Sequence, residues 1–422
     1  MSPNSQPELE AKTAADARLR VFDTKRGWQL GTLVPVLVVA VCAVWVAQNW
    51  QNIIEDGARA AEIDFTVFWA AAKLAYSGDP LAAFNPDTLV LVHGIYEGKW
   101  MPWLYPPGFL IALIPLGAFS FPIAWIIFIS VSLLAMLAAI RQFAGGVTPV
   151  WIGFSVAPAM LPALIIGQTS VLWIACLLAA LASLRSGRPI MAGVLIGFLT
   201  LKPQLGILIP VALLACFAWR TIAAAAVTTL ILAAVSTLIM GAEYWVQMKE
   251  LAEVHVEVIR EASIENHLMV SLFSILLGMG VSEVWAFSMQ WCATGLAAIT
   301  VALAWYSPRV DFDLRAATLL LAIMVSSPYF WYYESAVLAP AALFLLRAGV
   351  LKTSGLGSVL AALMWLGAVP ATLFIILSDI RVVSVRFTLA PVAFAACLVC
   401  LFAVIQRLRS PELPEFKNEV PK

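Results

Sequence analysis

The chain has 422 residues, of which 62% are hydrophobic and only 12% are charged, and its mean hydropathy is +0.93. Soluble domains carry about twice that share of charged residues, so much of the apolar surface must face lipid. Basic and acidic residues are equal in number, 25 of each, and no basic stripe is present. This composition excludes a soluble enzyme and a nucleic-acid-binding protein.

Apolar runs follow one another along the chain, and they indicate membrane helices because one bilayer crossing takes about 20 apolar residues. The runs are 28–48, 104–118, 122–140, 150–166, 169–184, 189–218, 221–241, 267–280, 283–305, 316–332, 335–351, 355–377 and 387–405. We therefore predict an all-α fold, a polytopic membrane bundle of about 10–13 transmembrane helices. Residues 1–27 are expected to form a disordered cytoplasmic tail, residues 28–409 a single transmembrane domain, and residues 410–422 a second cytoplasmic tail.

Basic residues predict the orientation of the chain, because lysine and arginine in short loops mark the cytoplasmic side. Both termini are expected there, from Arg18, Arg20, Lys25, Arg26, Arg407 and Arg409. Two long polar segments, 49–103 and 243–267, then fall on the outer face, where acidic residues outnumber basic ones by seven to three and six to two. We expect a multi-pass protein of the cytoplasmic (inner) membrane, with its functional residues on the outer loops.

The run 104–118 is expected to enter the membrane and turn back. It has only 15 residues and contains Pro106, Pro107 and Pro115, so it is short for a full crossing. A re-entrant run here moves Gln168 to the outer face, near the first long loop. A place in a hairpin turn is the alternative role for Gln168.

Both outer segments contain apolar residues at helical spacing, which predicts amphipathic helices lying along the outer interface. In the first segment these residues are Phe65, Phe68, Trp69, Ala72 and Tyr76. In the second they are Tyr244, Trp245, Met248, Leu251, Ala252, Val258 and Ile259. The bundle is therefore expected to carry juxtamembrane helices on its outer face.

Asp64 is the carboxylate best placed for chemistry, just beyond the first membrane helix at the outer surface. At a partly desolvated interface its pKa would rise, and it would be suited to take a proton from a sugar hydroxyl. The competing interpretation is structural, because Asp is also a favoured N-cap residue and a helix is predicted directly after it.

Lys202 lies in the middle of the long apolar run 189–218, where a charge is costly and indicates a functional role. Its expected partner is a lipid-linked phosphate, and the alternative is a lysine that snorkels from a broken helix end. Arg381 and Arg386 fall in an outer connection, against the charge rule. They are expected to bind phosphate or, alternatively, to pair with Asp379.

Other polar and aromatic residues on the outer side are candidates for substrate binding, although Tyr105 is also explained as an interfacial anchor. They are Tyr105, Gln168, His255, Asn266, His267 and Glu334. The histidines form no i, i+4 pair, so we expect no metal site. The sequence has no glycine-rich phosphate-binding motif in a suitable position, so we expect no nucleotide or other cofactor.

The order of these motifs resembles glycosyltransferase family 87, a family of multi-pass membrane transferases in the GT-C superfamily. The motifs are Asp64 before an aromatic helix, Tyr105-Pro106-Pro107, Gly167-Gln168, Lys202-Pro203, Asn266 at the start of a short run, and Ser327-Pro328 with Trp331. The resemblance covers roughly residues 28–405.

This resemblance implies an inverting transfer of a hexose, typically mannose, from a polyprenyl-phosphate carrier to a lipid or glycan acceptor on the outer side of the membrane. Asp64 matches the catalytic acid of the family, and Lys202 matches the lysine of its Lys-Pro element. Phosphate binding by Lys202, Arg381 and Arg386 is our own inference. The competing hypothesis is a transporter or lipid-linked-sugar flippase without covalent chemistry, which would place paired charges near the bilayer midplane.

Overall fold

A computed structural model describes residues 14–55, 63–93, 102–265, 268–370 and 385–410 of the chain. Within these ranges the fold is all-helical, with a helical segment at residues 14–19, 18 further α-helices, short 3-10 helices and a single bridge between Met269 and Trp331. The fold class predicted from the sequence is therefore confirmed. The predicted tails at residues 1–13 and 411–422 lie outside the described residues.

The α-helices are α2 (Lys25–Glu55), α3 (Phe65–Tyr76), α4 (Pro86–His93), α5 (Pro107–Leu113), α6 (Phe121–Arg141), α7 (Pro149–Ser155), α8 (Leu161–Ile165), α9 (Ser170–Arg185), α10 (Pro189–Leu199), α11 (Ile209–Ala215), α12 (Trp219–Met240), α13 (Glu243–Glu265), α14 (Leu272–Gly278), α15 (Glu283–Tyr306), α16 (Phe312–Ser326), α17 (Leu338–Arg347), α18 (Leu356–Leu366) and α20 (Val385–Arg409). The 3-10 helices are η2 (Arg20–Phe22), η4 (Pro80–Phe84), η5 (Ile114–Ala118), η6 (Pro158–Met160), η7 (Pro203–Leu205) and η8 (Tyr332–Val337).

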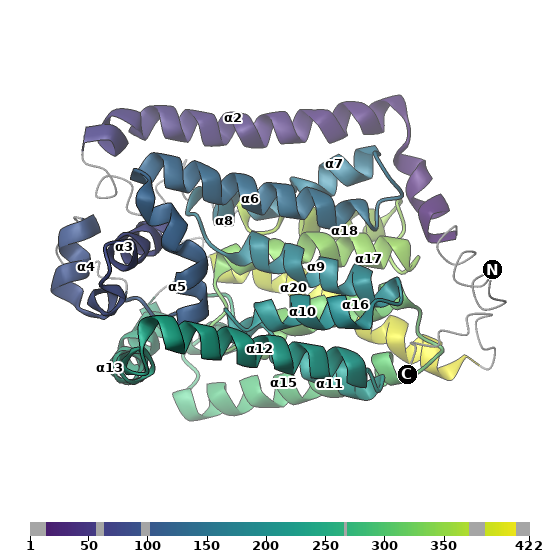
Figure 1. The fold of residues 1–422 in the computed structure, drawn as a ribbon. Helices are drawn as coiled ribbons and strands as arrows, with labels where there is room; N and C mark the ends of the chain where they lie inside the picture. The colour runs from purple at the N-terminus through teal and green to yellow at the C-terminus, as the bar shows by residue number, and fades with distance from the viewer. Residues whose placement is uncertain (1–13, 56–62, 94–101, 266–267, 371–384, 411–422) are drawn as a thin grey trace.

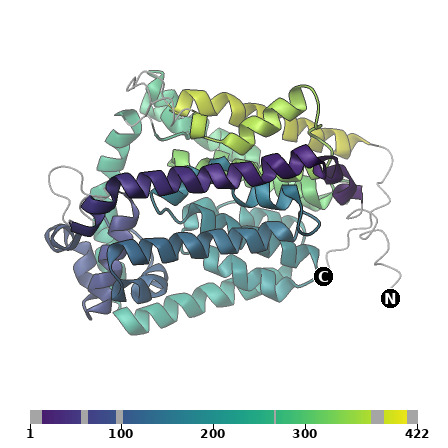
Figure 2. The same ribbon diagram turned by 90° about the horizontal axis from the view of Figure 1, so that it is seen from above.

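The long apolar helices lie side by side, and the short helices α3 and α4 gather with the 23-residue α13 at one end of the bundle, which we call the α3 end (Figure 1). Helix α2 runs along the outside of the bundle in both ribbon views (Figures 1 and 2). The centre is formed by α16 and α17, and every residue of α17 is buried. The core is therefore built from apolar helices packed on apolar helices.

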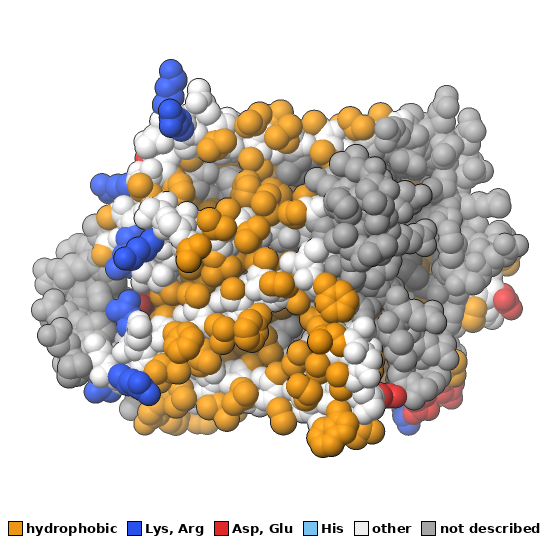
Figure 3. All heavy atoms as spheres, turned by 180° about the vertical axis from the view of Figure 1, so that it is seen from behind, with side chains coloured by type: hydrophobic (Ala, Val, Ile, Leu, Met, Phe, Trp, Pro, Cys, Tyr) orange, Lys and Arg blue, Asp and Glu red, His pale blue; other side chains and the backbone are white. Residues whose placement is uncertain are grey.

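Four helices in the described part of the chain are long and apolar enough to cross a membrane: α6, α12, α15 and residues Phe387–Arg409 of α20. Their outer faces are apolar, as Leu238 on α12 illustrates with an exposed fraction of 86%. Lys and Arg side chains gather at the end opposite α3, and a band of hydrophobic side chains separates them from acidic side chains (Figure 3). The chain is therefore a multi-pass membrane protein.

Several predicted runs form broken helices instead of single spans. The run 104–118 is divided into α5 and η5, and neither piece is long enough to cross a bilayer. The run 189–218 breaks after α10, where Lys202 and Pro203 begin a 3-10 turn. The break at Lys202 occurs where Pro203 removes a backbone donor and disfavours helical geometry in the preceding residue.

The prediction that residues 1–27 are disordered is wrong from residue 14 onward. Residues 14–19 are helical, and Asp16 forms an ion pair of 2.8 Å with Arg347 at the end of α17. Arg347 also pairs with Asp313 at 3.0 Å, and Arg18 donates to the Arg347 carbonyl. The N-terminal segment is thus ordered by a buried guanidinium rather than by hydrophobic burial alone.

The prediction of an amphipathic interfacial helix after Asp64 is also wrong. In α3 every residue from Phe65 to Ala72 is buried, because other short helices and α6 surround its first two turns. Helix α13 is amphipathic as predicted, because Tyr244 is fully buried while Lys249 and Glu250 are exposed. Its place along the outer interface stays a prediction. The helix after Asp64 thus packs inside the α3 end, and α13 lies at its surface.

The start of α3 lies directly against the turn between α8 and α9. The Phe65 amide donates to the Ile166 carbonyl at 2.9 Å. Gly167 has a φ of +68°, and a Cβ atom there would lie 2.4 Å from the Phe65 Cβ. Only glycine fits both the left-handed backbone and this close approach. This contact fixes the residue before α3 next to the residue after Gly167.

Replacing Gly167 with alanine is expected to destabilise the fold more than the same change at Gly187. Gly187 also has a positive φ, +65°, but open space around it, so Gly187→Ala reports backbone strain of about 1–2 kcal/mol. Gly167→Ala adds a collision with Phe65, which should cost about 1–3 kcal/mol more. Unfolding curves of the purified variants in detergent measure both losses. Equal losses of unfolding free energy in the two variants would mean that the close contact between α3 and Gly167 does not require glycine.

Candidate active site

Five segments far apart in the sequence place polar side chains together at the α3 end of the bundle. They carry Asp64, Tyr105, Gln168, Lys202 and Glu334. The charges of Lys202, Asp64 and Glu334 all act on the Tyr105 hydroxyl, and Gln168 hydrogen-bonds with it. The structure therefore brings together five of the residues selected from the sequence.

Asp64 precedes α3, but its side chain makes no capping hydrogen bond with that helix. Its Oδ2 instead accepts a hydrogen bond of 2.5 Å from Nε2 of Gln168, whose Oε1 accepts from the Thr169 amide at 3.2 Å. The N-cap interpretation of Asp64 is therefore wrong. The Thr169 amide fixes the orientation of the Gln168 side chain, which presents its NH₂ group to the carboxylate.

Burial raises the pKa of the Asp64 carboxyl above its ordinary value of 3.8. The hydrogen bond from Gln168 and the charge of Lys202 act in the opposite direction without cancelling this rise. Asp64 lies between α2 and α3, outside the long apolar helices. A carboxylate with a raised pKa is a better base than an exposed one, and such groups gather at functional sites.

Lys202 and Glu334 form a buried ion pair, with 2.7 Å between Nζ and Oε1 and side-chain exposed fractions of 6% and 2%. The other carboxylate oxygen of Glu334 accepts from the Trp331 amide at 2.9 Å. The Lys202 ammonium also lies 5.4 Å from the centre of the Tyr333 ring. Snorkelling requires an exposed ammonium, so that interpretation of Lys202 is wrong, and Glu334 is the partner that sequence reasoning did not find.

Backbone breaks put these side chains in place. Tyr105 precedes Pro106 and Pro107, and Pro107 occupies the first turn of α5, where its missing N–H costs nothing. Lys202 precedes Pro203 and has an extended φ of −136°. Each residue therefore lies at a helix end, where its side chain is not held to one face of a helix.

Aromatic side chains from both outer segments hold Tyr105. Its ring packs edge-on against Phe68 at 5.1 Å, and the Tyr244 hydroxyl donates to its carbonyl at 3.0 Å. Nε1 of Trp103 donates to the same Tyr244 hydroxyl at 2.5 Å. Sequence reasoning did not find Trp103 as part of the site, and it noted Tyr244 only as a residue of the apolar face of a helix.

A cavity of about 280 Å³ opens beside this cluster, between α5, α9 and α10. Tyr105, Thr169 and Lys202 are among its lining residues, and the other lining residues are mostly apolar, Phe109 and Trp173 among them. The cavity thus has a hydrocarbon-like wall and lies beside side chains that carry a cation and hydroxyls. It suits an amphiphilic ligand with an anionic head.

The other residues selected from the sequence are not joined to this cluster by the described contacts. His255 is a half-buried residue of α13, and it is not among the groups whose charges act on Asp64 or Lys202. Asn266, His267 and Arg381 lie outside the described residues, as does the side chain of Arg386. In the described part of the chain, no group of three or more His, Cys, Asp or Glu residues is arranged to hold a metal ion.

Replacing Lys202 with methionine should destabilise the protein by about 3–5 kcal/mol, because Glu334 is left buried without its partner. The double variant Lys202→Met/Glu334→Gln should regain most of this loss, since neither charge remains. Unfolding of the single and double variants in detergent measures the coupling. Lys249→Met is the control, because Lys249 forms an exposed pair with Glu253 and no measurable loss is expected. Additive losses in the double variant would contradict the coupling.

Comparison with known proteins agrees with this grouping of residues. The sequence model of glycosyltransferase family 87 matches residues 103–328, which include Tyr105, Gln168 and Lys202. The match is shorter than the expected 28–405, and it leaves Asp64 and Glu334 outside. No curated protein and no solved structure matches the chain. Because the family model covers more than half of the sequence, the chain belongs to glycosyltransferase family 87 and is a membrane glycosyltransferase.

Proposed function

We propose that the enzyme transfers a hexose, with mannose the expected sugar, from a polyprenyl-phosphate carrier to a lipid or glycan acceptor, with inversion at the anomeric carbon. One observation carries this proposal: the Asp64 carboxyl, with its raised pKa, lies within electrostatic range of the buried Lys202, beside a cavity that is mostly apolar. A base, a cation and an apolar cavity are the three features that transfer from a lipid phosphate requires.

The reaction is a single displacement. Asp64 takes the proton of the acceptor hydroxyl, and the acceptor oxygen forms a bond with the anomeric carbon. The bond from that carbon to the phosphate oxygen breaks at the opposite face, and the lipid phosphate leaves with the electron pair. Lys202 stabilises the negative charge that develops on the phosphate. The phosphate-linked sugar is already activated, so this step balances without a nucleotide.

Glu334 acts in this scheme as a positioning residue for Lys202. The Glu334 carboxylate lies 2.7 Å from Nζ of Lys202 and so fixes where the ammonium group lies. In the proposed complex, donors of this ammonium group bind phosphate oxygens. The carboxylate also offsets the charge of Lys202 before the donor binds, which keeps the cost of burying the lysine low.

Aromatic rings around Asp64 support a sugar as the group transferred. The charge of Asp64 acts on the hydroxyls of both Tyr332 and Tyr333, so these rings lie near the proposed base. The centres of the two rings are 5.5 Å apart, and the ring planes are inclined at 66°. Aromatic faces are apolar while tyrosine hydroxyls are polar, which matches the apolar C–H faces and polar edges of a hexose.

The charge distribution supports transfer at the outer side of the cytoplasmic membrane, with both termini in the cytoplasm. Lys and Arg side chains gather at the end of the bundle opposite the site (Figure 3). Basic residues in short connections favour the cytoplasmic side, so the α3 end is assigned to the outer face. Arg381 and Arg386 remain proposed as further phosphate ligands, and His255, Asn266 and His267 as substrate contacts.

Asp64→Asn is expected to lower kcat by about 10²- to 10⁴-fold, because asparagine cannot accept the proton of the acceptor. The measurement is hexose transfer from polyprenyl-phosphate mannose to a lipid acceptor by the purified protein, with the product detected by its added hexose mass. Asp79→Asn is the matched control, because the exposed Asp79 carboxylate only caps η4. Retention of more than a tenth of the activity by Asp64→Asn would exclude Asp64 as the base.

The transfer rate should fall as the pH is lowered through the raised pKa of Asp64, because the protonated carboxyl is no longer a base. The fall in rate on the acid side of the pH profile, which we call the acid limb, should have its midpoint above the ordinary carboxyl pKa of 3.8. Gln168→Ala removes a hydrogen bond that lowers the pKa, so the limb should move to higher pH. The pH profile of kcat/KM measures both values. A lower rate without movement of the limb would mean that Gln168 has only a structural role.

A further inference from the structure

A second hollow, of about 460 Å³, follows α9 between α6 and α10. On α9 its lining residues run from Leu172 to Ser186, which is about 21 Å of helix. It reaches the surface of the bundle, because Ala138 and Arg188 in its lining are exposed. One leaflet contributes about half of the roughly 30 Å hydrocarbon core of a bilayer. The hollow is therefore long enough for one acyl chain of a phospholipid.

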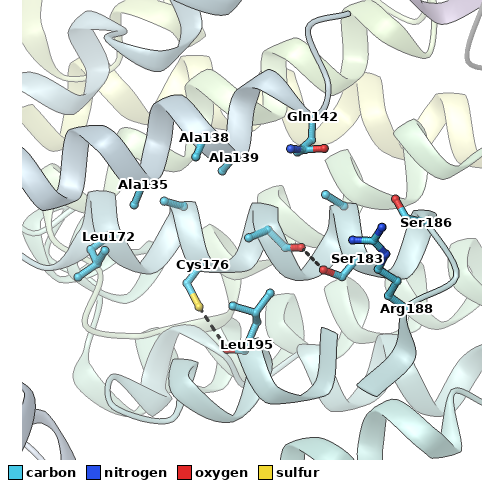
Figure 4. Close-up of a pocket in the computed structure, with 13 residues that line it drawn as sticks. Ala135, Ala138, Ala139, Gln142, Leu172, Cys176, Ser183, Ser186, Arg188 and Leu195 are labelled. Carbon is cyan, nitrogen blue, oxygen red and sulfur yellow. Dashed lines mark hydrogen bonds between the residues drawn. The ribbon is translucent and has the colours of Figure 1, made fainter. Parts of the chain in front are cut away.

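The lining of this hollow is apolar along most of its length and polar at one end. Leu172 lies towards the apolar end, and Gln142, Ser183, Ser186 and Arg188 lie towards the other (Figure 4). Arg188 makes no capping hydrogen bond with α10, and it has no ion pair within the described ranges of the chain. Its guanidinium is therefore available to an anion.

The three helices around the hollow carry positive charge at its polar end and no negative charge anywhere. Helix α6 ends at Arg141, α9 ends at Arg185, and Arg188 precedes α10. Between Glu97 and Glu243 the sequence contains no acidic residue at all. The charge rule for membrane proteins explains arginines at this end, but it does not explain why a hollow ends at them. The charge distribution favours an anionic ligand.

Contacts with a ring and with the backbone hold Arg185 at the polar end. Its guanidinium lies 4.4 Å from the centre of the Phe143 ring and donates to the Gln142 carbonyl. Asp16 lies beside the loop after α6, but its carboxylate pairs with Arg347 at 2.8 Å. The position of the positive charge is thus set by the fold before any ligand binds.

We propose that this hollow binds an anionic phospholipid of the surrounding leaflet, with its phosphate at Arg188 and one acyl chain along α9. The side chains of Gln142 and Ser186 are exposed beside Arg188 and supply further donors to the phosphate oxygens. The leaflet is the one at the end of the bundle opposite the α3 end, and calling it cytoplasmic rests on the orientation proposed above. The site is separate from the transfer reaction and needs no sugar.

This lipid would stabilise the helices that carry two residues of the candidate active site. Helix α9 begins shortly after Gln168, and α10 ends shortly before Lys202. The lipid contacts both helices and α6 near their opposite ends. Because it binds the folded chain only, it raises the stability of the fold in proportion to the logarithm of its concentration.

Phosphatidylglycerol and phosphatidylcholine with identical acyl chains test the headgroup assignment on the delipidated full-length protein in detergent. Native mass spectrometry counts the bound lipids, and a titration gives their dissociation constants. The wild type should bind one phosphatidylglycerol about tenfold more tightly than phosphatidylcholine, whose choline cation is repelled by the arginines. Arg188→Gln should lose this preference. Arg409→Gln should keep it, because Arg409 is an exposed arginine at the end of α20 that does not line the hollow.

Bulk placed in the hollow tests the path of the acyl chain. Ala138→Trp should weaken the binding of both phospholipids by about tenfold, because the indole takes the space of the chain. Leu134→Trp is the matched control and should change neither affinity, because Leu134 is exposed one turn away on α6 and does not line the hollow. Without lipid, Arg188→Gln should unfold at the temperature of the wild type, since its side chain makes no ion pair in the described part of the chain.

The contrary outcomes are specific. Equal affinities of the wild type for the two phospholipids, or equal preferences in Arg188→Gln and Arg409→Gln, would overturn the headgroup site. Equal affinities of Ala138→Trp and Leu134→Trp would overturn the acyl-chain path, as would competition by inorganic phosphate at the concentration of the phospholipid. Displacement of phosphatidylglycerol by an equal amount of undecaprenyl phosphate would assign the hollow to that lipid instead. None of these measurements depends on hexose transfer, so they leave the proposed function untouched.

Discussion

The ion pair between Lys202 and Glu334 is the interaction around which the site is organised. Two charges removed from water are stable only when they meet with good geometry, and here 2.7 Å separates them. The pair joins the break after α10 to η8, segments more than a hundred residues apart. It also matters for Asp64, because an unbalanced Lys202 would lower the pKa of that carboxyl more strongly and weaken it as a base.

Helix breaks give the site its shape. The segments that carry Tyr105, Gln168 and Lys202 each end or begin a helix, and prolines or a left-handed glycine mark these positions. Irregular backbone at membrane depth is tolerated where it is buried in protein or lines a cavity, and here it does both. The polar side chains carried by these different segments therefore meet in one cluster around Tyr105.

Local features of the sequence were enough to predict the helices, their breaks and most of the cluster. Apolar runs and prolines act on neighbouring residues, so Lys202-Pro203 and Tyr105-Pro106 were readable as break points. Contacts between residues far apart in the sequence could not be predicted in this way. Gln168 meets Asp64 across 104 positions, and no local pattern records that contact. The burial of the first two turns of α3 on all sides was missed for the same reason, because part of their surroundings comes from segments distant in the sequence.

The buried guanidinium of Arg347 has a practical consequence for handling the protein. Its partners include Asp16, and Arg18 donates to its carbonyl, so the helix of residues 14–19 is part of the folded body. An affinity tag fused ahead of residue 14 leaves these contacts intact. A truncation that reaches residue 18 leaves Arg347 with fewer partners at the opposite end of the bundle from the site, and poorer yields of folded enzyme would follow even though no substrate contact is touched.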